Sequence, residues 1–220
     1  MGKHVKCSAD YHDYVFKDGE FIGKFEEMYQ NVEDPWHQDD TSEIHYDMAL
    51  YLLNRYDVCR SRGGVVLDIG CGLGSFTAKL RKGLNKDTRI IGIDIAPTAI
   101  QKAKEKYGDL GIDFIVCDIE KEFEHLPLPS SGLDLIVMSE LMWYVLPAFK
   151  DICQGIKCYL KDEGYLIINQ TFYPPEKQKY GKEIASNVRD VFKLVSLPLL
   201  EIIETNRFKN HHAICLFKKD

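Results

Sequence analysis

Residues 65–74 decide the fold of this chain, and they read VVLDIGCGLG. The first half is an apolar run with one acid, Asp68, and the second half holds three alternate glycines, Gly70, Gly72 and Gly74. Glycine lets a backbone turn tightly and bring its N–H groups against a ligand, which a side chain at Cβ would block. The stretch therefore predicts a buried strand that ends in a nucleotide-type binding loop.

The spacing of the glycines restricts the ligand. The dinucleotide fingerprint G-x-G-x-x-G has its third glycine one residue later than Gly74, and no Gly-Lys-Ser/Thr ending of a P-loop follows. Asp68 would repel a phosphate but attract an ammonium. The acid followed by Gly-Cys-Gly-x-Gly resembles the first motif of class I S-adenosylmethionine-dependent methyltransferases. The resemblance implies S-adenosyl-L-methionine as cofactor, S-adenosyl-L-homocysteine as product, and cofactor contacts from Asp68, Gly70, Cys71, Gly72 and Gly74.

Apolar runs alternate with amphipathic stretches from residue 65 onward, which predicts a parallel sheet with crossover helices. The predicted strands are Val65–Asp68, Arg89–Asp94, Asp113–Cys117, Leu133–Met138, Gly164–Asn169, Leu200–Asn206 and His211–Lys218. The predicted helices are Ser75–Lys82, Pro97–Tyr107, Phe149–Leu160 and Ile184–Leu194. We therefore expect an α/β fold with a single doubly wound, mostly parallel seven-stranded sheet, similar to the Rossmann-like methyltransferase fold. The last two strands are candidates for antiparallel pairing at the sheet edge.

The first sixty residues do not follow this alternation. A helix is predicted from about Thr41 to Asp57, with Ile44, Met48, Tyr51 and Leu52 on one face. The segment is rich in aromatic residues, namely Tyr11, Tyr14, Phe16, Phe21, Phe25, Tyr29, Trp36 and Tyr46. Packing is the more ordinary role for them, but a segment before the first strand can also fold over the open top of the sheet as a lid. We expect residues 1–60 to form an N-terminal helical cap segment and residues 61–220 a cofactor-binding domain.

Two further acids end the next two predicted strands. Asp94 lies 20 residues beyond the glycine loop, where an acid can accept hydrogen bonds from both ribose hydroxyls; the alternative is that it caps the following helix. Asp118 follows the third strand, and the resemblance implies that it binds the exocyclic amine of adenine while the Ile119 N–H reaches a ring nitrogen. Ile95 and Ile119 would flank the adenine. Buried carboxylates are unfavourable unless they are hydrogen-bonded, and one cofactor would satisfy all three acids.

The segment after the fourth predicted strand, SELMWY at residues 139–144, occupies the position from which methyltransferases present residues to the reacting methyl group. Together with Met28-Tyr29 and Asp34-Pro35-Trp36, it resembles the rhizobial nodulation N-methyltransferases, which methylate a free amine of a chito-oligosaccharide. Trp143 and the HQDD run at residues 37–40 depart from that pattern. Ser139, Tyr29 and Trp36 are assigned to the cofactor site.

Glu140, Tyr144 and His37 are the catalytic candidates. Glu140 can orient an amine or accept its proton; capping a helix is the alternative. Tyr144 can hydrogen-bond the acceptor or only line the site, and His37 can cover the acceptor or lie at the surface. His211 and His212 open the last predicted strand, where packing is favoured over a site role. No His and carboxylate spacing indicates a metal site.

Composition limits the partners. With 45% hydrophobic and 28% charged residues in 220, the chain is typical of one soluble domain. Its net charge of −6 gives no basic footprint for nucleic acid or an anionic membrane. Scattered cysteines and the lack of an apolar leader or spanning run predict a cytoplasmic protein.

These observations predict a methyltransferase that acts on an amine or hydroxyl of a small polar acceptor, with a sugar or related metabolite favoured. The alternatives are a protein or nucleic-acid methyltransferase, a non-catalytic cofactor-binding protein of the same fold, and a dehydrogenase.

Overall fold

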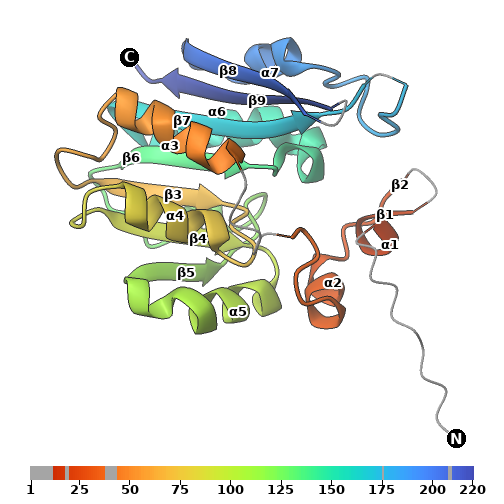
Figure 1. Ribbon diagram of the computed structural model, residues 1–220, viewed down its shortest axis with the longest axis horizontal. Helices are drawn as coiled ribbons and strands as arrows, with labels where there is room; N and C mark the ends of the chain where they lie inside the picture. Colours follow the sequence, from red (N-terminus) through yellow and green to blue (C-terminus); the bar gives the residue numbers. More distant parts are fainter. Residues whose placement is uncertain (1–11, 18–19, 38–43, 175, 208–209) are drawn as a thin grey trace, which may run out of the picture.

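The structure is a computed structural model that describes residues 12–17, 20–37, 44–174, 176–207 and 210–220. Its main sheet has seven strands in the order β5-β4-β3-β6-β7-β9-β8 (Figure 1). The strands are β3 (Val65–Ile69), β4 (Arg89–Asp94), β5 (Ile112–Val116), β6 (Leu133–Ser139), β7 (Leu160–Phe172), β8 (Leu199–Arg207) and β9 (Asn210–Lys218). The first five in this order pair in parallel, and β9 pairs antiparallel with both β7 and β8. The predicted doubly wound, mostly parallel sheet is confirmed.

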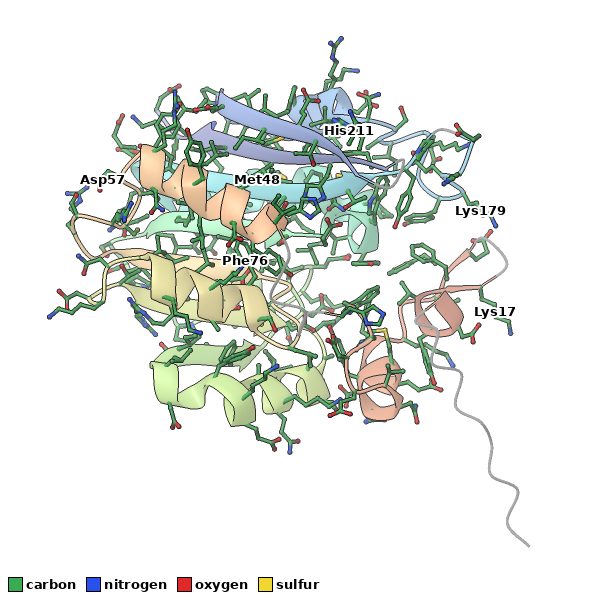
Figure 2. All side chains as sticks on the ribbon, viewed as in Figure 1. Lys17, Met48, Asp57, Phe76, Lys179 and His211 are labelled. Carbon is green, nitrogen blue, oxygen red and sulfur yellow. The ribbon has the colours of Figure 1, made fainter. Side chains whose placement is uncertain are left out.

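Helices cover both faces of this sheet because its strands are apolar on both faces. One layer contains α3 (Ile44–Arg55), α4 (Ser75–Gly83) and α5 (Pro97–Tyr107), and the other contains α6 (Phe149–Tyr159) and α7 (Val188–Leu194). Alternate residues of β3 divide between the two cores: Val66 packs under α3 and α4, whereas Leu67 and Ile69 pack under α6. Met48 and Phe76 lie on the face of α3 and α4 (Figure 2). Short 3₁₀ turns, η1 (Gly108–Leu110), η2 (Phe123–His125), η3 (Met142–Tyr144) and η4 (Leu146–Ala148), complete the connections.

The chain before α3 forms a separate small layer. It contains α1 (His12–Val15), a two-stranded hairpin of β1 (Phe16–Lys17) and β2 (Glu20–Phe21), and α2 (Phe25–Asn31). Figure 1 shows these elements at the right, beside the ends of β3, β4 and β5. Their apolar side chains share a cluster with Leu73 of the glycine loop and Ala99 of α5. We name this layer, residues 12–37 as far as they are described, the N-terminal cap.

The expected face of α3 is confirmed only in part. Leu52 is buried and Met48 packs against the core, whereas Tyr51 is 53% exposed and Ile44 is 45% exposed. Tyr46, Ala49 and Leu53 are also buried. The reason is that the helix packs on α4 and on the sheet through positions spaced three and four apart, with Tyr46 stacked on Phe76 at 4.4 Å between ring centroids. Thr41, the predicted start, lies outside the described residues. The predicted domain boundary at residue 60 stays a prediction. In the structure, α3 packs against α4 and the sheet.

Several other element bounds differ from the prediction, among them those of α7 and β7. The helix α7 begins at Val188 and not at Ile184, because the Asn187 side chain accepts a hydrogen bond from the Arg189 N–H and caps it there. Strand β7 runs on from Asn169 to Phe172, because β9 pairs with it along this whole length. This extension brings Gln170 and Thr171 to the carboxyl end of the sheet. None of the helices within the described ranges has the length and apolar character that crossing a membrane requires.

Candidate active site

A cavity of about 520 Å³ opens at the carboxyl ends of β3, β4 and β6, a size typical of small-molecule sites. The sheet side contributes residues that follow these strands and β5: Asp68, Gly70, Cys71, Asp94, Ile95, Cys117, Asp118, Ile119, Ser139 and Glu140. The N-terminal cap contributes the opposite wall: Phe21, Ile22, Gly23, Phe25, Tyr29, Pro35, Trp36 and His37. The cavity therefore lies between the sheet and the cap.

The three glycines of the loop have different roles, although all have positive φ. Gly70 lines the cavity, and a Cβ there would approach Leu141 to 2.8 Å. Gly72 donates its N–H to Asp94 Oδ2 at 2.9 Å. A Cβ at Gly74 would approach the Phe114 ring to 2.8 Å, so this glycine allows close packing of the loop on β5. Gly72 and Gly74, which the sequence assigned to direct cofactor contact, do not line the cavity.

Asp68 is a buried carboxylate in the cavity wall, with 2% of its surface exposed. Thr77 of α4 donates its hydroxyl to Asp68 Oδ2 at 2.6 Å. Burial, with a smaller contribution from Asp94, raises the pKa of the Asp68 carboxyl to about 7 against the lowering effect of Thr77. A cation beside Asp68 would stabilise the charged carboxylate. This part of the cavity therefore favours an ammonium group.

The carboxylate of Asp94 is held by backbone donors on both oxygens. Gly72 N–H bonds to Oδ2 and Ala96 N–H to Oδ1, each at 2.9 Å. Burial raises the pKa of this carboxyl, and the two backbone hydrogen bonds oppose the shift. Because each carboxylate oxygen accepts more than one hydrogen bond, Asp94 keeps the capacity for two further donors from the cavity.

Asp118 is bonded within its own loop. Its Oδ2 lies 2.7 Å from the Lys121 ammonium, which is exposed, and its Oδ1 accepts the Glu120 N–H at 3.0 Å. Ile119 follows Asp118 after β5, Ile95 follows Asp94 after β4, and both isoleucines line the cavity. Asp118 thus lines the cavity, and it forms an ion pair with Lys121.

Aromatic rings of the N-terminal cap surround Tyr144, which follows β6. The Tyr144 ring centroid lies 5.3 Å from Phe25, 5.4 Å from Trp36 and 6.4 Å from Phe16. Trp36 donates its indole N–H to the Tyr29 hydroxyl at 2.9 Å. Such contacts combine apolar burial with a fixed ring geometry. They join the cap to the part of the cavity that follows β6.

Polar contacts also attach the cap to α5. The Glu26 carboxylate accepts the Thr98 N–H at 2.9 Å and the Thr98 hydroxyl at 2.6 Å. Lys102 donates to the backbone carbonyls of Tyr29 at 2.7 Å and Val32 at 3.1 Å. These bonds place α2 beside the first turn of α5, where a carboxylate also interacts favourably with the helix dipole.

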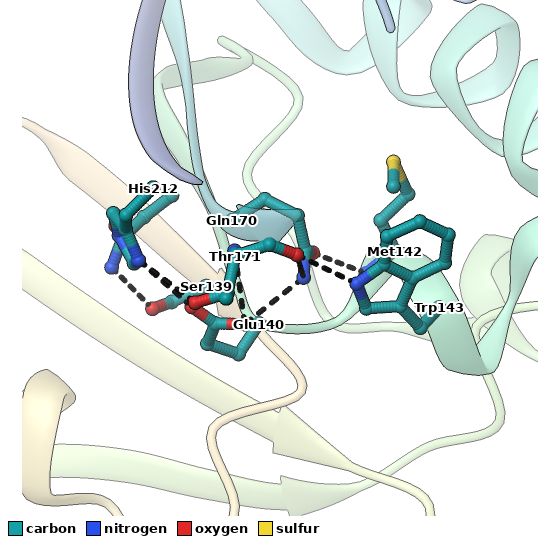
Figure 3. A network of polar contacts seen from close by, with 8 residues as sticks. Ser139, Glu140, Met142, Trp143, Gln170, Thr171 and His212 are labelled. Atoms are coloured by element: carbon teal, nitrogen blue, oxygen red, sulfur yellow. Dashed lines mark hydrogen bonds and ion pairs between the residues drawn. The ribbon is translucent and has the colours of Figure 1, made fainter. Parts of the chain in front are cut away.

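Glu140 belongs to a network that connects β6, β7 and β9 (Figure 3). Its backbone is left-handed, with φ of +54°, and its N–H donates to Asn169 O at 2.8 Å. Its carboxylate accepts from Gln170 Nε2 at 3.0 Å, from Thr171 N at 3.2 Å and from the Thr171 hydroxyl at 2.8 Å. Glu140 is therefore held by the sheet, and the alternative role as a helix cap is not what the structure shows.

The other predicted residues are distributed around the same cavity. Ser139 lines it, and its Oγ accepts the Asn169 side-chain amide at 2.8 Å. His37 is exposed at the cavity rim with φ of +52°, and Tyr173, which is 39% exposed, lies on the acceptor side.

Sequence reasoning missed Thr171 and set His212 aside. His212 is buried and packs beside Thr171 in the register of β7 and β9. No local motif marks either residue, because their proximity to Glu140 depends on how three strands pair.

Residues 60–210 match the profile of a family described as a methyltransferase domain. The chain belongs to this methyltransferase-domain family. Nodulation protein S of Sinorhizobium fredii is 27% identical over 142 residues, which cover 62% of this chain and 60% of that protein. Carboxy-S-adenosyl-L-methionine synthase of Chromohalobacter salexigens is 25% identical over 119 residues, covering 53% and 43%. The chain thus spans less than two thirds of the length of either relative.

One of the solved structures that resemble this chain has the same fold. The N-methyltransferase NodS of Bradyrhizobium japonicum WM9 superposes with a TM-score of 0.62 at 20% identity, covering 81% of this chain and 98% of that one. At this identity the likeness concerns the fold. The family predicted from the glycine loop is confirmed, and nodulation proteins are among its relatives in both sequence and structure.

Proposed function

We propose that the protein is an S-adenosylmethionine-dependent methyltransferase whose acceptor is an amine or hydroxyl of a small polar molecule. The cavity at the carboxyl ends of the strands carries this proposal, because it collects Gly70 of the glycine loop, three acids and Glu140 on its sheet side. Family membership supports the reaction class. Binding at a topological switch point of an open α/β sheet is the general expectation for such a cavity.

The residues of the cavity fit the proposed cofactor. Asp68 presents a buried carboxylate for the ammonium, and burial raises the pKa of this carboxyl. Asp94 has spare acceptor capacity for the ribose hydroxyls. Asp118 and the flanking Ile119 would hold the adenine, with Lys121 sharing the Asp118 charge. When bound, S-adenosylmethionine supplies an electrophilic methyl group.

The remaining walls would orient the acceptor and exclude water. Tyr144 and the cap aromatics form an apolar boundary, and a dry site favours the loss of charge during transfer from a sulfonium. Glu140 lines the same cavity, and its carboxylate would accept the proton that the acceptor releases. Tyr144 and His37 would contact the acceptor from either side, and the N-terminal cap would act as the lid.

A sugar or a related metabolite is the acceptor class that we propose. The cavity offers aromatic rings for an apolar sugar face and Glu140 for a polar substituent. The resemblance of residues 139–144 and of Asp34-Pro35-Trp36 to the rhizobial nodulation N-methyltransferases supports this choice and favours an amine.

Calorimetry with S-adenosylmethionine tests the cofactor assignment, and a panel of amino sugars, polyols and small amines with labelled methyl groups tests the reaction. We expect binding and a methylated product read by mass. Absence of binding at millimolar cofactor would reject the proposal. Binding with no product from any panel member would favour a non-catalytic cofactor-binding protein, whereas methylated RNA or protein in a parallel assay would favour the macromolecular alternative.

A further inference from the structure

The Thr171 hydroxyl lies between Glu140 and His212. Its Oγ1 is 2.8 Å from Glu140 Oε1 and 2.8 Å from His212 Nδ1 (Figure 3). A hydroxyl carries one hydrogen and therefore donates to one of these two acceptors at a time, while its lone pairs can accept from the other. The direction of this single hydrogen depends on which neighbour carries a proton.

The contact between His212 Nε2 and Asn169 defines the tautomer of the imidazole ring. His212 Nε2 lies 2.5 Å from Asn169 Oδ1, and the Asn169 amide nitrogen donates to Ser139 Oγ at 2.8 Å. Since Asn169 Oδ1 only accepts, Nε2 carries the hydrogen and Nδ1 has a free lone pair toward Thr171. Burial lowers the pKa of His212 to about 3, and the stacked ring of His45, 3.4 Å away between centroids, contributes. The ring is thus a neutral acceptor.

The loop that carries Glu140 is fixed relative to β7. Met142 N–H donates to Gln170 Oε1 at 3.0 Å, and the Trp143 indole donates to Thr171 O at 2.8 Å. Glu140 itself has a left-handed backbone, a conformation that is unfavourable for a residue other than glycine and is concentrated at functional sites. These bonds keep Glu140 within reach of Thr171.

Both protonation states of Glu140 can be hydrogen-bonded in this arrangement. When Glu140 is charged, its Oε1 accepts the Thr171 hydroxyl hydrogen, as the structure shows. When Glu140 is protonated at Oε1, Thr171 Oγ1 accepts from it and turns its own hydrogen to His212 Nδ1. Rotation of one hydroxyl therefore stabilises the acid and the carboxylate in turn.

We propose that Thr171 and His212 are positioning residues that make Glu140 a reversible acceptor for the proton released by the methyl acceptor. This inference rests on the proposed function. The acceptor N–H or O–H bond breaks, an O–H bond forms at Glu140 Oε1, and the Thr171 hydrogen changes partner without leaving its oxygen. The same proton leaves Glu140 to solvent when the product departs, and no other reactant is needed.

The first test observes the imidazole and needs no methyl transfer. In Glu140→Gln the side-chain oxygen should occupy the Oε2 position, because Gln170 Nε2 and Thr171 N both donate there. The new amide N–H then faces Thr171 Oγ1 and imitates the protonated acid. Nitrogen NMR with labelled histidine should show the Nδ1 resonance of His212, assigned by its loss in His212→Gln, moving toward a hydrogen-bonded acceptor value.

The Thr171 hydroxyl must be the carrier of this response. In Glu140→Gln combined with Thr171→Val the movement should vanish, whereas with Thr205→Val it should persist. Thr205 is a matched control because it is the other register partner of His212, on β8, and its buried hydroxyl has no hydrogen-bond partner within the described residues. The proposed role of Thr171 and His212 is overturned if the Nδ1 resonance is the same in wild type and Glu140→Gln, or if it still moves without the Thr171 hydroxyl.

The second test uses turnover with whichever panel acceptor gives product. Thr171→Val should lower kcat by about 10–100-fold with little change in KM, the effect expected for loss of one hydrogen bond to a charged group. Thr171→Ser should restore most of it, since it keeps the hydroxyl. Equal kcat for the two variants, both folded by thermal melting, overturns the inference. Absence of cofactor binding by the wild type would instead reject the proposed function.

Discussion

The sheet side of the cavity has two parts that are built differently, and we name them the cofactor wall and the acceptor wall. The cofactor wall comes from residues that end or follow β3, β4 and β5, and its contacts connect the ends of neighbouring parallel strands, such as Gly72 after β3 with Asp94 of β4. The acceptor wall depends on side chains that three strands bring together, with Glu140 after β6, Thr171 on β7 and His212 on β9. The order of strands and loops in the sequence therefore marks the first wall, whereas the pairing of β7 with β9 specifies the second. Substitutions should separate the two walls into binding and turnover effects.

Glu140→Gln should have the largest effect, and it should act on turnover alone. Removal of a general base typically lowers kcat by about 10²–10⁴-fold. The amide keeps the hydrogen bonds from Gln170 and Thr171 N, so the cofactor affinity should change little. Stopped assays with the identified acceptor, beside calorimetry, measure the two effects. Glu124→Gln in η2, an exposed residue away from the cavity, is the control. An equal loss in both quantities would move Glu140 to the cofactor wall.

Asp94→Asn should affect binding instead. The amide nitrogen must face either Gly72 N–H or Ala96 N–H, because each carboxylate oxygen accepts one of these donors. Loss of one charge-assisted bond and of ribose contacts predicts cofactor binding weaker by about 100-fold. Asp113→Asn on β5, whose carboxylate pairs with Arg89 at the surface, controls for the change of charge. Undiminished binding by Asp94→Asn would remove Asp94 from the cofactor wall.

The sequence predicted the cofactor wall better than the acceptor wall, for a physical reason. Asp68, Asp94 and Asp118 lie at strand ends, and parallel strands in one sheet end at one edge, so their proximity follows from the strand pattern. Thr171 lies in an extension of β7 that exists because β9 pairs with it, and that pairing is non-local. Likewise, the buried face of α3 depends on α4 and the sheet and not on the apolar spacing of the helix alone.

Asp68→Asn should change the pH dependence of stability. The folded protein holds a proton on Asp68 up to about pH 7, whereas the unfolded chain loses it near pH 4. Wild-type stability should therefore fall as pH rises from about 4 through 7 by up to about 1.4 kcal/mol per unit. The neutral variant escapes this loss, so without cofactor its stability relative to the wild type should rise by up to about 4 kcal/mol between pH 4 and pH 8.

Urea unfolding at pH 5 and pH 8 measures this difference. The same variant should bind S-adenosylmethionine more weakly, because it lacks the charge that faces the ammonium. A stability difference that is the same at both pH values would show that the pKa of Asp68 is not raised in the folded protein.

Glu26→Gln should have the smallest effect and concerns the attachment of the N-terminal cap. Although burial raises it, hydrogen bonds from Thr98 and Gln30 together leave the pKa of the Glu26 carboxyl lowered. Because this pKa is lowered, the charged Glu26 carboxylate stabilises docking of the cap at pH values above its unfolded pKa near 4.5. This stabilisation is lost as the pH falls through the folded pKa. Because the pair is partly solvated, we expect a contribution of about 0.5–1 kcal/mol.

Limited proteolysis between α2 and α3 reports cap opening, and calorimetry reports its effect on cofactor affinity. Glu26→Gln should be cleaved a few-fold faster and bind a few-fold more weakly at pH 7, and the difference from wild type should shrink toward pH 4. Glu27→Gln, on the same helix and paired only with Lys24 among the described contacts, is the matched control. If both variants are cleaved at the wild-type rate while the cofactor still binds, the aromatic contacts around Tyr144 hold the cap, and its attachment belongs to the acceptor wall.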